Sequence, residues 1–453
     1  MFYLMHKDIK VLKFSLYENG NINKVYEIYN IEHMPFSTNI CINKNDYSML
    51  KEWWSDRSIP YTRNEYNNIV NNIEDTSLSL VVKANGLSLT DQYWIKDEND
   101  NISYDDISFF TNKFNEDLGD LLVGKPLKNQ INYYSPDSTS TGNLKKRWKI
   151  IDGRRVLLKA GTKPNQYEIF NEIIASKIMT ILNIDHVEYS FIKDEDIYCA
   201  SEDFIKYNED FVSAYQLKNY KKKPNDEDLF NYLVDIYKDL EISDYKTKIN
   251  QMLFIDFIAG NIDRHLNNFG VIRDAKTLEF IKVAPIYDTG SCFGYDLTDN
   301  QLNHITELDW KPFKTNKIDN QLELIDDFSW LDLESLKILP KETDNILTKY
   351  KDYISEGRRE SLLHFLIRRI NMVYSYLNID YEVKYNISTE LSLKEKKIYD
   401  YIKQKQIIVD ISPICIKYNY SYITVYRAIS GLVEKGLIKR VGSKKTGYWI
   451  ITE

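Results

Sequence analysis

The sequence has few of the residues that mark secreted, disordered or membrane-spanning chains. Its four cysteines, Cys41, Cys199, Cys292 and Cys415, lie far apart and form no CxxC pair, so we expect reduced thiols in a cytoplasmic protein. Only 16 Gly and 10 Pro occur among 453 residues, and 43% of the residues are hydrophobic. This composition excludes a disordered chain and allows ordinary cores.

Two longer patterns are also missing. The chain has no run of about 18 apolar residues, so no membrane span is expected. The N-terminal stretch "MFYLMHKDIKVLKF" carries charges too early for a signal peptide and has no small-residue cleavage site.

What the sequence does have is an uneven distribution of charge. Residues 391–453 hold 12 Lys and Arg against 5 Asp and Glu, a net charge of +7. The whole chain has 59 basic and 67 acidic residues, so positions 1–390 hold 47 and 62, a net charge of −15. An acidic body with a basic C-terminal region predicts that only that region binds polyanions.

The first segment, residues 1–130, is predicted to be an N-terminal α+β module with a structural or partner-binding role. We expect strands in "IKVLKFSLY" and "LSLVVKA", and helices in "DYSMLKEWWSD" and "DISFFTNKFNEDLGDLL". No chemical motif stands out in this segment.

Residues 131–210 follow the order loop, strand, tight turn, strand, helix. The loop is 135–144, rich in Ser and Thr, and the turn is Asp152-Gly153, a strong hairpin signal. The helix spans 167–182, where isoleucines recur at helical spacing. Residues 211–385 are mostly helical in pattern, and a polar linker separates them from 391–453.

The densest polar cluster is "GNIDRHLNNFG" (260–270), and "PIYDTG" (285–290) follows it. Phosphoryl transfer needs a loop over the phosphates, a cation, metal ligands and an oriented acceptor. Asp263 and Asn268 have the spacing of a kinase catalytic Asp and its metal-binding Asn, and Asp288 opens an Asp-x-Gly. Asp263 would orient or deprotonate the acceptor hydroxyl, and the oxygen ligands Asn268 and Asp288 suit Mg²⁺.

The other parts of a kinase site lie upstream in the expected order. Lys159 ends the second strand, where the kinase cation sits, and Glu172 on the next helix could pair with it. The loop with Gly142 comes just before the first strand. Each part alone has an ordinary explanation: a surface lysine, a solvent-facing glutamate, a plain linker. Arg264 is expected to form a structural ion pair, although it could instead neutralise a phosphorylated loop, and His265 could be a structural hydrogen-bond donor. The ordered set favours the kinase. "DTG" also marks aspartic proteases, but these need two such Asp residues, and only one occurs here.

These motifs resemble the catalytic and metal-binding signatures of the HipA-like serine/threonine kinases, and "FNEIIASKIMTILNI" resembles the helix after the lysine strand in that family. The resemblance covers about 135–375. It implies a two-lobed, protein-kinase-like α+β fold, with residues 131–210 as the N-lobe and 211–385 as the helical C-lobe.

The resemblance also implies roles for single residues. It implies ATP and Mg²⁺ as cofactors, with Lys159 on the phosphates, and an adenine-binding hinge in "SEDFIKYNED". Autophosphorylation would fall in the loop. The cofactor-binding candidates on this basis are Lys159, Glu172, Ser138, Thr139, Ser140, Thr141, Gly142, Glu202, Asp203, Phe204 and His265. The loop has more hydroxyls and fewer glycines than a typical kinase loop, and the Asp-Arg-His order is shared with lipid kinases.

Residues 391–453 follow the order of a winged helix-turn-helix: helix, short helix, longer helix, basic hairpin. Ser421 is a plausible N-cap of the longer helix, with Ile423, Ala428, Leu432 and Leu437 near the core. Candidates for DNA contact are Tyr422, Thr424, Tyr426 and Arg427 on this helix and Lys439, Arg440, Lys444 and Lys445 on the wing. A protein-binding winged helix is the alternative, and the +7 charge favours DNA.

The leading hypothesis is therefore an ATP-dependent HipA-like serine/threonine protein kinase with its own DNA-binding module, acting as a toxin or as a defence or regulatory kinase. A protein substrate and an antitoxin or regulatory partner are expected, and no membrane. The alternatives are a DNA-binding transcriptional regulator whose kinase-like body senses ATP or another ligand, and a small-molecule or lipid kinase.

Overall fold

The computed structural model describes residues 1–40, 42, 46–63, 76–126, 131–305, 308, 310, 313, 318–385, 391, 393–435, 437–442 and 447–452. The chain separates into two compact units, Met1–Tyr385 and Asn386–Glu453, and each is described by itself. In the described ranges, no helix is long and apolar enough to cross a membrane. The predicted boundaries inside the first unit stay predictions.

The N-terminal module contains a four-stranded antiparallel sheet with helices packed beside it. The sheet order is β3-β2-β1-β4, with β1 (Phe2–His6), β2 (Ile9–Leu16), β3 (Ile22–Ile28) and β4 (Tyr93–Asp97). The helices are α1 (Ser48–Asp56), α3 (Ser77–Lys83), α4 (Tyr104–Ile107) and α5 (Asp117–Leu122). Val11, Phe14 and Trp54 form part of its buried core.

Two predictions in this module were wrong. The stretch 78–84, expected as a strand, lies mainly in helix α3, because the Thr76 side chain accepts from the Ser79 amide and caps a helix start. The single helix expected over 106–122 is instead interrupted between two short helices, α4 and α5. Helix α4 ends because Ser108 has extended backbone angles.

A second four-stranded antiparallel sheet, of order β5-β6-β8-β7, carries the predicted lysine strand. Its strands are β5 (Lys146–Ile151), β6 (Arg154–Lys159), β7 (Ser190–Lys193) and β8 (Ile197–Glu202). Asp152 and Gly153 both have positive φ, 49° and 78°, as a two-residue hairpin turn of this kind requires. Helix α6 (Tyr167–Ile181) follows, as predicted. A buried 3₁₀ turn, η2 (Pro136–Thr139), precedes β5.

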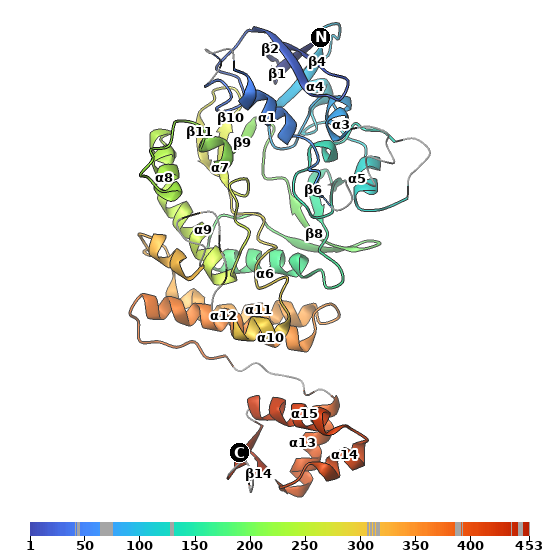
Figure 1. Ribbon diagram of the computed structural model, residues 1–453, viewed down its shortest axis with the longest axis vertical. Coiled ribbons are helices and arrows are strands. Elements are labelled where there is room, and N and C mark those ends of the chain that lie inside the picture. The colour runs from blue at the N-terminus through green and yellow to red at the C-terminus, as the bar shows by residue number, and fades with distance from the viewer. Residues whose placement is uncertain are drawn as a thin grey trace. The chain divides into compact units, whose positions relative to one another are not determined.

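The rest of the first unit is mainly helical and includes a three-stranded sheet of order β11-β10-β9, with β9 (Glu209–Ser213), β10 (Gly270–Asp274) and β11 (Phe280–Val283). The helical segments are α7 (Ala214–Leu217), α8 (Leu229–Asp239), α9 (Tyr245–Ala259), α10 (Asp299–His304), η3 (Ile318–Leu324), α11 (Leu333–Lys349) and α12 (Glu356–Tyr376). Figure 1 shows strands β1, β2 and β4 at one end of this unit and helices α11 and α12 at the other. The arrangement is mixed α and β, as expected for a two-lobed kinase-like fold.

The described residues of the second unit form three helices and a small antiparallel sheet of order β12-β14-β13. Its elements are α13 (Leu393–Lys405), β12 (Ile407–Ile408), α14 (Ser412–Tyr418), α15 (Tyr422–Glu434), β13 (Ile438–Val441) and β14 (Tyr448–Ile451). Ser421 caps α15 as predicted, because its side chain accepts from the Thr424 amide. Val425, Ile429 and Leu432 form the buried face of α15. Ile423 was wrongly placed near the core and is 63% exposed.

Candidate active site

The polar loop after α9 is built around a buried arginine. Gly260 ends α9 with a left-handed φ of 64°, which Gly adopts without strain. Arg264 is fully buried, and its Nε and Nη2 each donate to Asp256 at 2.9 Å. Its Nη1 donates to the carbonyls of Asn268 and Tyr287 at 2.9 and 2.8 Å. Arg264 thus forms the predicted structural ion pair and ties both polar motifs to α9.

The same loop brings the candidate catalytic residues together. The Asn268 side-chain amide donates to the Asp263 carbonyl at 3.3 Å, and the Asn268 backbone amide donates to the His265 carbonyl at 2.8 Å. Asp263 and His265 are exposed, whereas Asn268 is buried. The loop therefore presents a solvent-accessible carboxylate beside a fixed carboxamide.

Lys159 sits between two carboxylates that come from distant parts of the chain. Its Nζ donates to Asp288 Oδ1 at 2.8 Å and to Glu172 Oε1 at 3.2 Å. The other oxygen of Glu172 accepts from the amide and hydroxyl of Thr289 at 2.8 and 2.7 Å. The expected pairing of Lys159 with Glu172 is present, and Glu172 also holds the Asp-Thr-Gly turn.

Charge in this cluster is fixed by the ion pairs. Burial opposes a charge on Lys159, but Asp288 and its other neighbours outweigh it and raise the pKa of Lys159 well above its ordinary value. Burial also opposes ionisation of Asp288, yet Lys159 and Lys146 hold the pKa of Asp288 well below its ordinary value. Both groups are therefore charged near neutral pH.

Lys146 was missed by the sequence interpretation. It lies opposite Lys159 in the β5–β6 register and lines the same cleft. Burial, and then the charge of Lys159, lower the pKa of Lys146 to about 7. The cross-strand register could have identified it, because the hairpin through Asp152-Gly153 places these two lysines side by side.

An open cleft of about 860 Å³ joins these parts. Its volume falls within the range of small-molecule sites. Its lining includes Lys159, Asp288, Asn268 and His265, and also the predicted hinge residues Glu202, Asp203 and Phe204. Burial raises the pKa of Asp203 well above its ordinary value. Residues of the N-terminal module, among them Trp53, Arg57 and Asp91, form another wall.

The predicted phosphate loop is only partly in the cleft. Thr139, Ser140, Thr141 and Gly142 line it. Ser138 is fully buried, and its hydroxyl donates to the Ser135 carbonyl at 3.0 Å, so in this structure Ser138 is not presented to the cleft. Residues 135–144 were predicted to be a loop, and the structure shows a 3₁₀ turn over Pro136–Thr139 at the start of this loop.

Part of this chain is similar to a known kinase. No family model matches the chain. A stretch of 131 residues is 30% identical to the serine/threonine-protein kinase CtkA of Helicobacter pylori, covering 27% of this chain and 40% of that relative's length. The resemblance to the HipA-like kinases is confirmed.

Two solved structures also align with this chain. The crystal structure of the H. pylori proinflammatory kinase CtkA has a TM-score of 0.40 and 19% identity, covering 51% of this chain and 93% of that one. HipA of Shewanella oneidensis, in a complex with HipB and operator DNA, has a TM-score of 0.49 and 10% identity, covering 84% and 98%.

The residues of this site fit Mg²⁺ only when a bound ligand supplies further donor atoms. Within the described ranges, no group of three or more His, Cys, Asp or Glu side chains could hold a metal. Asp288 offers one carboxylate, and Asn268 offers its carboxamide oxygen because its nitrogen donates to the loop. Mg²⁺ typically takes one or two protein carboxylates and completes its shell with water and substrate phosphates, so this small donor set is suitable.

The candidate DNA-contacting residues of the second unit lie mainly on its surface. Tyr422, Tyr426 and Arg427 are exposed on α15, while Thr424 is half-buried and its hydroxyl bonds with that of Ser421. Lys439 and Arg440 are exposed on β13, and the Arg440 guanidinium lies 4.3 Å from the Trp449 ring centroid. Lys444 and Lys445 lie outside the described residues.

Proposed function

We propose that residues 1–385 act as an ATP-dependent serine/threonine protein kinase of the HipA-like type. The observation that carries this proposal is the position of Lys159 between Glu172 and Asp288, at a cleft that Asn268 also lines. A cation fixed next to one ionised carboxylate and one carboxamide is what a phosphate–metal complex needs.

The reaction would use these residues in separate roles. Asp263 would accept the proton of a serine or threonine hydroxyl as that oxygen forms a bond with the γ-phosphorus of ATP. The bond between the γ-phosphorus and the bridging oxygen then breaks, and ADP leaves. Asn268 and Asp288 would hold Mg²⁺, which neutralises charge on the phosphates when it is bound. Lys159 would orient the phosphates, and Glu172 would hold Lys159 in place.

Adenine would lie against the segment after β8. Glu202, Asp203 and Phe204 line the cleft there, and the Asp203 amide donates to the Arg155 carbonyl at 2.9 Å. Phe204 and Tyr287 pack with their ring centroids 5.2 Å apart. Flat apolar rings beside a polar backbone segment suit a purine base.

The kinase proposal is tested with the full chain, Mg²⁺ and γ-labelled ATP. We expect the wild type to label itself or a protein in a lysate, and Asp263→Ala or Asp288→Ala to lose at least about a hundredfold of this activity. Asp100→Ala, at an exposed turn in the N-terminal module, should behave as wild type. Full labelling by both Asp263→Ala and Asp288→Ala would refute the assignment. Transfer only to lipids or small molecules would favour the kinase alternative, and nucleotide binding without any transfer would favour a sensor.

We further propose that residues 391–453 form a winged helix-turn-helix that binds DNA. The sheet order and the three helices support this assignment, together with the net charge of +7. Deletion of 391–453 should leave the kinase reaction intact and abolish retardation of a DNA duplex at low salt. Retardation by the truncated chain would contradict this role.

The resemblance supports a biological role in which the kinase restrains growth and a separate antitoxin-like protein opposes it. Expression of the wild type should slow cell growth, and expression of Asp263→Ala should not. Equal growth with both proteins would argue against a toxin and leave a regulatory kinase.

A further inference from the structure

One residue of the N-terminal module, Arg63, contacts the phosphate loop directly. Its side chain is 2% exposed. The guanidinium donates to three successive loop carbonyls: Ser140 at 2.7 Å, Thr141 at 3.2 Å and Gly142 at 3.0 Å. It also donates to the Ser140 hydroxyl at 3.2 Å. A planar guanidinium with a rigid fork of donors is suited to gathering several acceptors at once.

These contacts determine the direction of the loop amides. In a trans peptide the carbonyl and the following N–H point in opposite directions. The peptides of this loop are trans, because the cis bond among the described residues, Lys163-Pro164, lies outside it. The amides of Thr141, Gly142 and Asn143 therefore point away from Arg63. Within the described part of the chain, none of the three has an acceptor. All three residues line the cleft that Lys146 and Lys159 also line.

We propose that Arg63 is a positioning residue of the nucleotide site, which turns three successive backbone amides toward the phosphates of a nucleoside di- or triphosphate. The inference rests on the proposed kinase function and gives the N-terminal module a place in it. Successive backbone N–H groups form anion-binding nests in proteins. The nearby lysines add the positive charge that phosphate requires.

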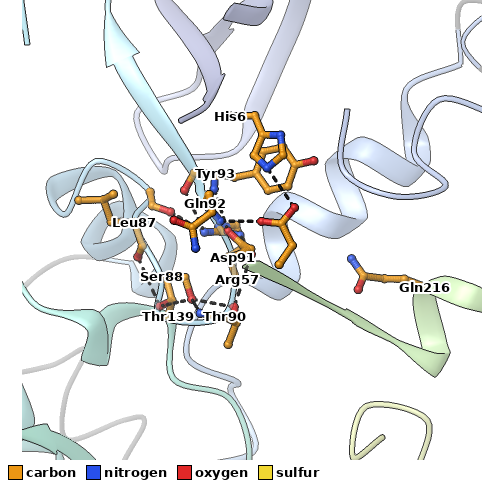
Figure 2. Close-up of polar contacts among 12 residues, drawn as sticks. His6, Arg57, Leu87, Ser88, Thr90, Asp91, Gln92, Tyr93, Thr139 and Gln216 are labelled. Atoms are coloured by element: carbon orange, nitrogen blue, oxygen red, sulfur yellow. Dashed lines mark hydrogen bonds and ion pairs between the residues drawn. The ribbon is translucent and has the colours of Figure 1, made fainter. Parts of the chain in front are cut away.

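The module contacts the loop at Thr139 and at Asn143 as well, so the position of the loop depends on more than one contact. Figure 2 shows Thr139 beside Ser88 and Thr90 of the module. The Thr139 hydroxyl lies 3.3 Å from that of Ser88, and the Thr62 hydroxyl donates to Asn143 Oδ1 at 2.8 Å. Gly142 has a φ of +84°, and a Cβ there would lie 2.7 Å from Lys146 Nζ. A side chain at 142 would therefore be strained and would crowd the lysine.

The test compares ADP with adenosine, because the two ligands differ only in the phosphates that the amides would contact. Binding to the full chain is measured by calorimetry with Mg²⁺ present. We expect Arg63→Ala to weaken ADP binding at least about tenfold, since one charge-assisted hydrogen bond is worth about that factor in affinity. Adenosine binding should not change. Arg63→Lys keeps the charge but lacks the forked donors, so an intermediate loss of ADP affinity is expected. If Arg63→Ala does not fold, Arg63→Lys is used for the test in its place.

The matched control is Arg359→Ala, which removes another buried arginine, one that pairs with Asp344 on α11. It should lower the unfolding temperature without changing the ratio of ADP to adenosine affinity. An equal loss of both ligands in the Arg63 variants, or no loss of either, overturns the inference and leaves the kinase proposal standing. Failure of the wild type to bind either ligand overturns both.

Discussion

The charged residues of the two units differ in their surroundings. In the first unit the charges near the cleft are paired and mostly buried: Arg264 pairs with Asp256, and Lys159 pairs with Glu172 and with Asp288, whose side chain is 34% exposed. In the second unit the basic residues proposed to face DNA, such as Arg427 and Lys439, are exposed. Buried charges fix one geometry, and removing one partner leaves the other uncompensated. Exposed charges are screened by salt, and each contributes little.

The largest effect should follow from Arg264→Ala. The variant leaves the fully buried Asp256 without its cation and frees the carbonyls of Asn268 and Tyr287. Removing one partner of a buried ion pair costs about 3–5 kcal/mol of unfolding free energy. Urea denaturation of the full chain would measure this loss. Lys435→Ala breaks the pair with Glu395 in the second unit, whose side chains are 12% and 13% exposed, whereas Arg264 and Asp256 are fully buried. It should cost less, and equal losses would contradict the contrast between the units.

A smaller loss of stability is expected at acidic pH. The buried Asp210 on β9 accepts from His6 Nε2 at 3.0 Å and from Arg273 Nε at 3.1 Å, and so joins β1 to the β9–β10 sheet. Burial opposes its charge, but His6 and Arg273 hold the pKa of Asp210 well below its ordinary value. This ionised form stabilises the fold above the unfolded pKa of about 4, and the contribution is lost as the pH falls below it.

Thermal unfolding between about pH 6 and pH 3 would detect this pH-dependent contribution of Asp210 to stability. The unfolding temperature of the wild type should fall with pH, and that of Asp210→Asn should start lower and fall less. Parallel curves for the two proteins would show that Asp210 contributes nothing to the acid sensitivity.

A change of about fourfold in DNA affinity is expected from contacts of the exposed apolar face of α15. Ile423 is 63% exposed and Tyr422 is 59% exposed, and apolar side chains at such positions contact thymine methyl groups. A DNA duplex selected by the full chain from a random library is compared with its deoxyuridine form. Each buried methyl contributes about 0.8 kcal/mol, or about fourfold in affinity. The wild type should prefer thymine and Ile423→Ala should not. Equal binding of both duplexes by the wild type would assign this face to another partner.

The smallest effect is expected for Lys439→Ala, since one phosphate contact is one among several. Binding to both duplexes should weaken together, and the slope of log affinity against log salt should fall by about 0.9. Gel retardation at several salt concentrations gives this slope. An unchanged slope would place Lys439 away from the phosphates.

Much of the candidate site could be predicted because its parts depend on local patterns. The hairpin through Asp152-Gly153, helix α6 and the Asp-Thr-Gly motif are short-range features, and they led to Lys159, Glu172 and Asp288. The strand expected over 78–84 was wrong because five consecutive residues of α3, 77–81, are buried, so the sequence shows no clear helical period there. Ile423 was misplaced because its apolar character was taken as a sign of burial.

By itself, the sequence determined the order of the kinase-like motifs, the turn that pairs β5 with β6, and the separation of a basic C-terminal region from an acidic body. Only the tertiary structure decided that Arg63 lies on the phosphate loop, that the Lys146–Lys159 pair lines the cleft, and that Asp210 joins β1 to β9. These contacts bring together residues that are tens to hundreds of positions apart. Their partners are chosen by packing and by the need to pair buried charges, and neither leaves a periodic signal in the chain.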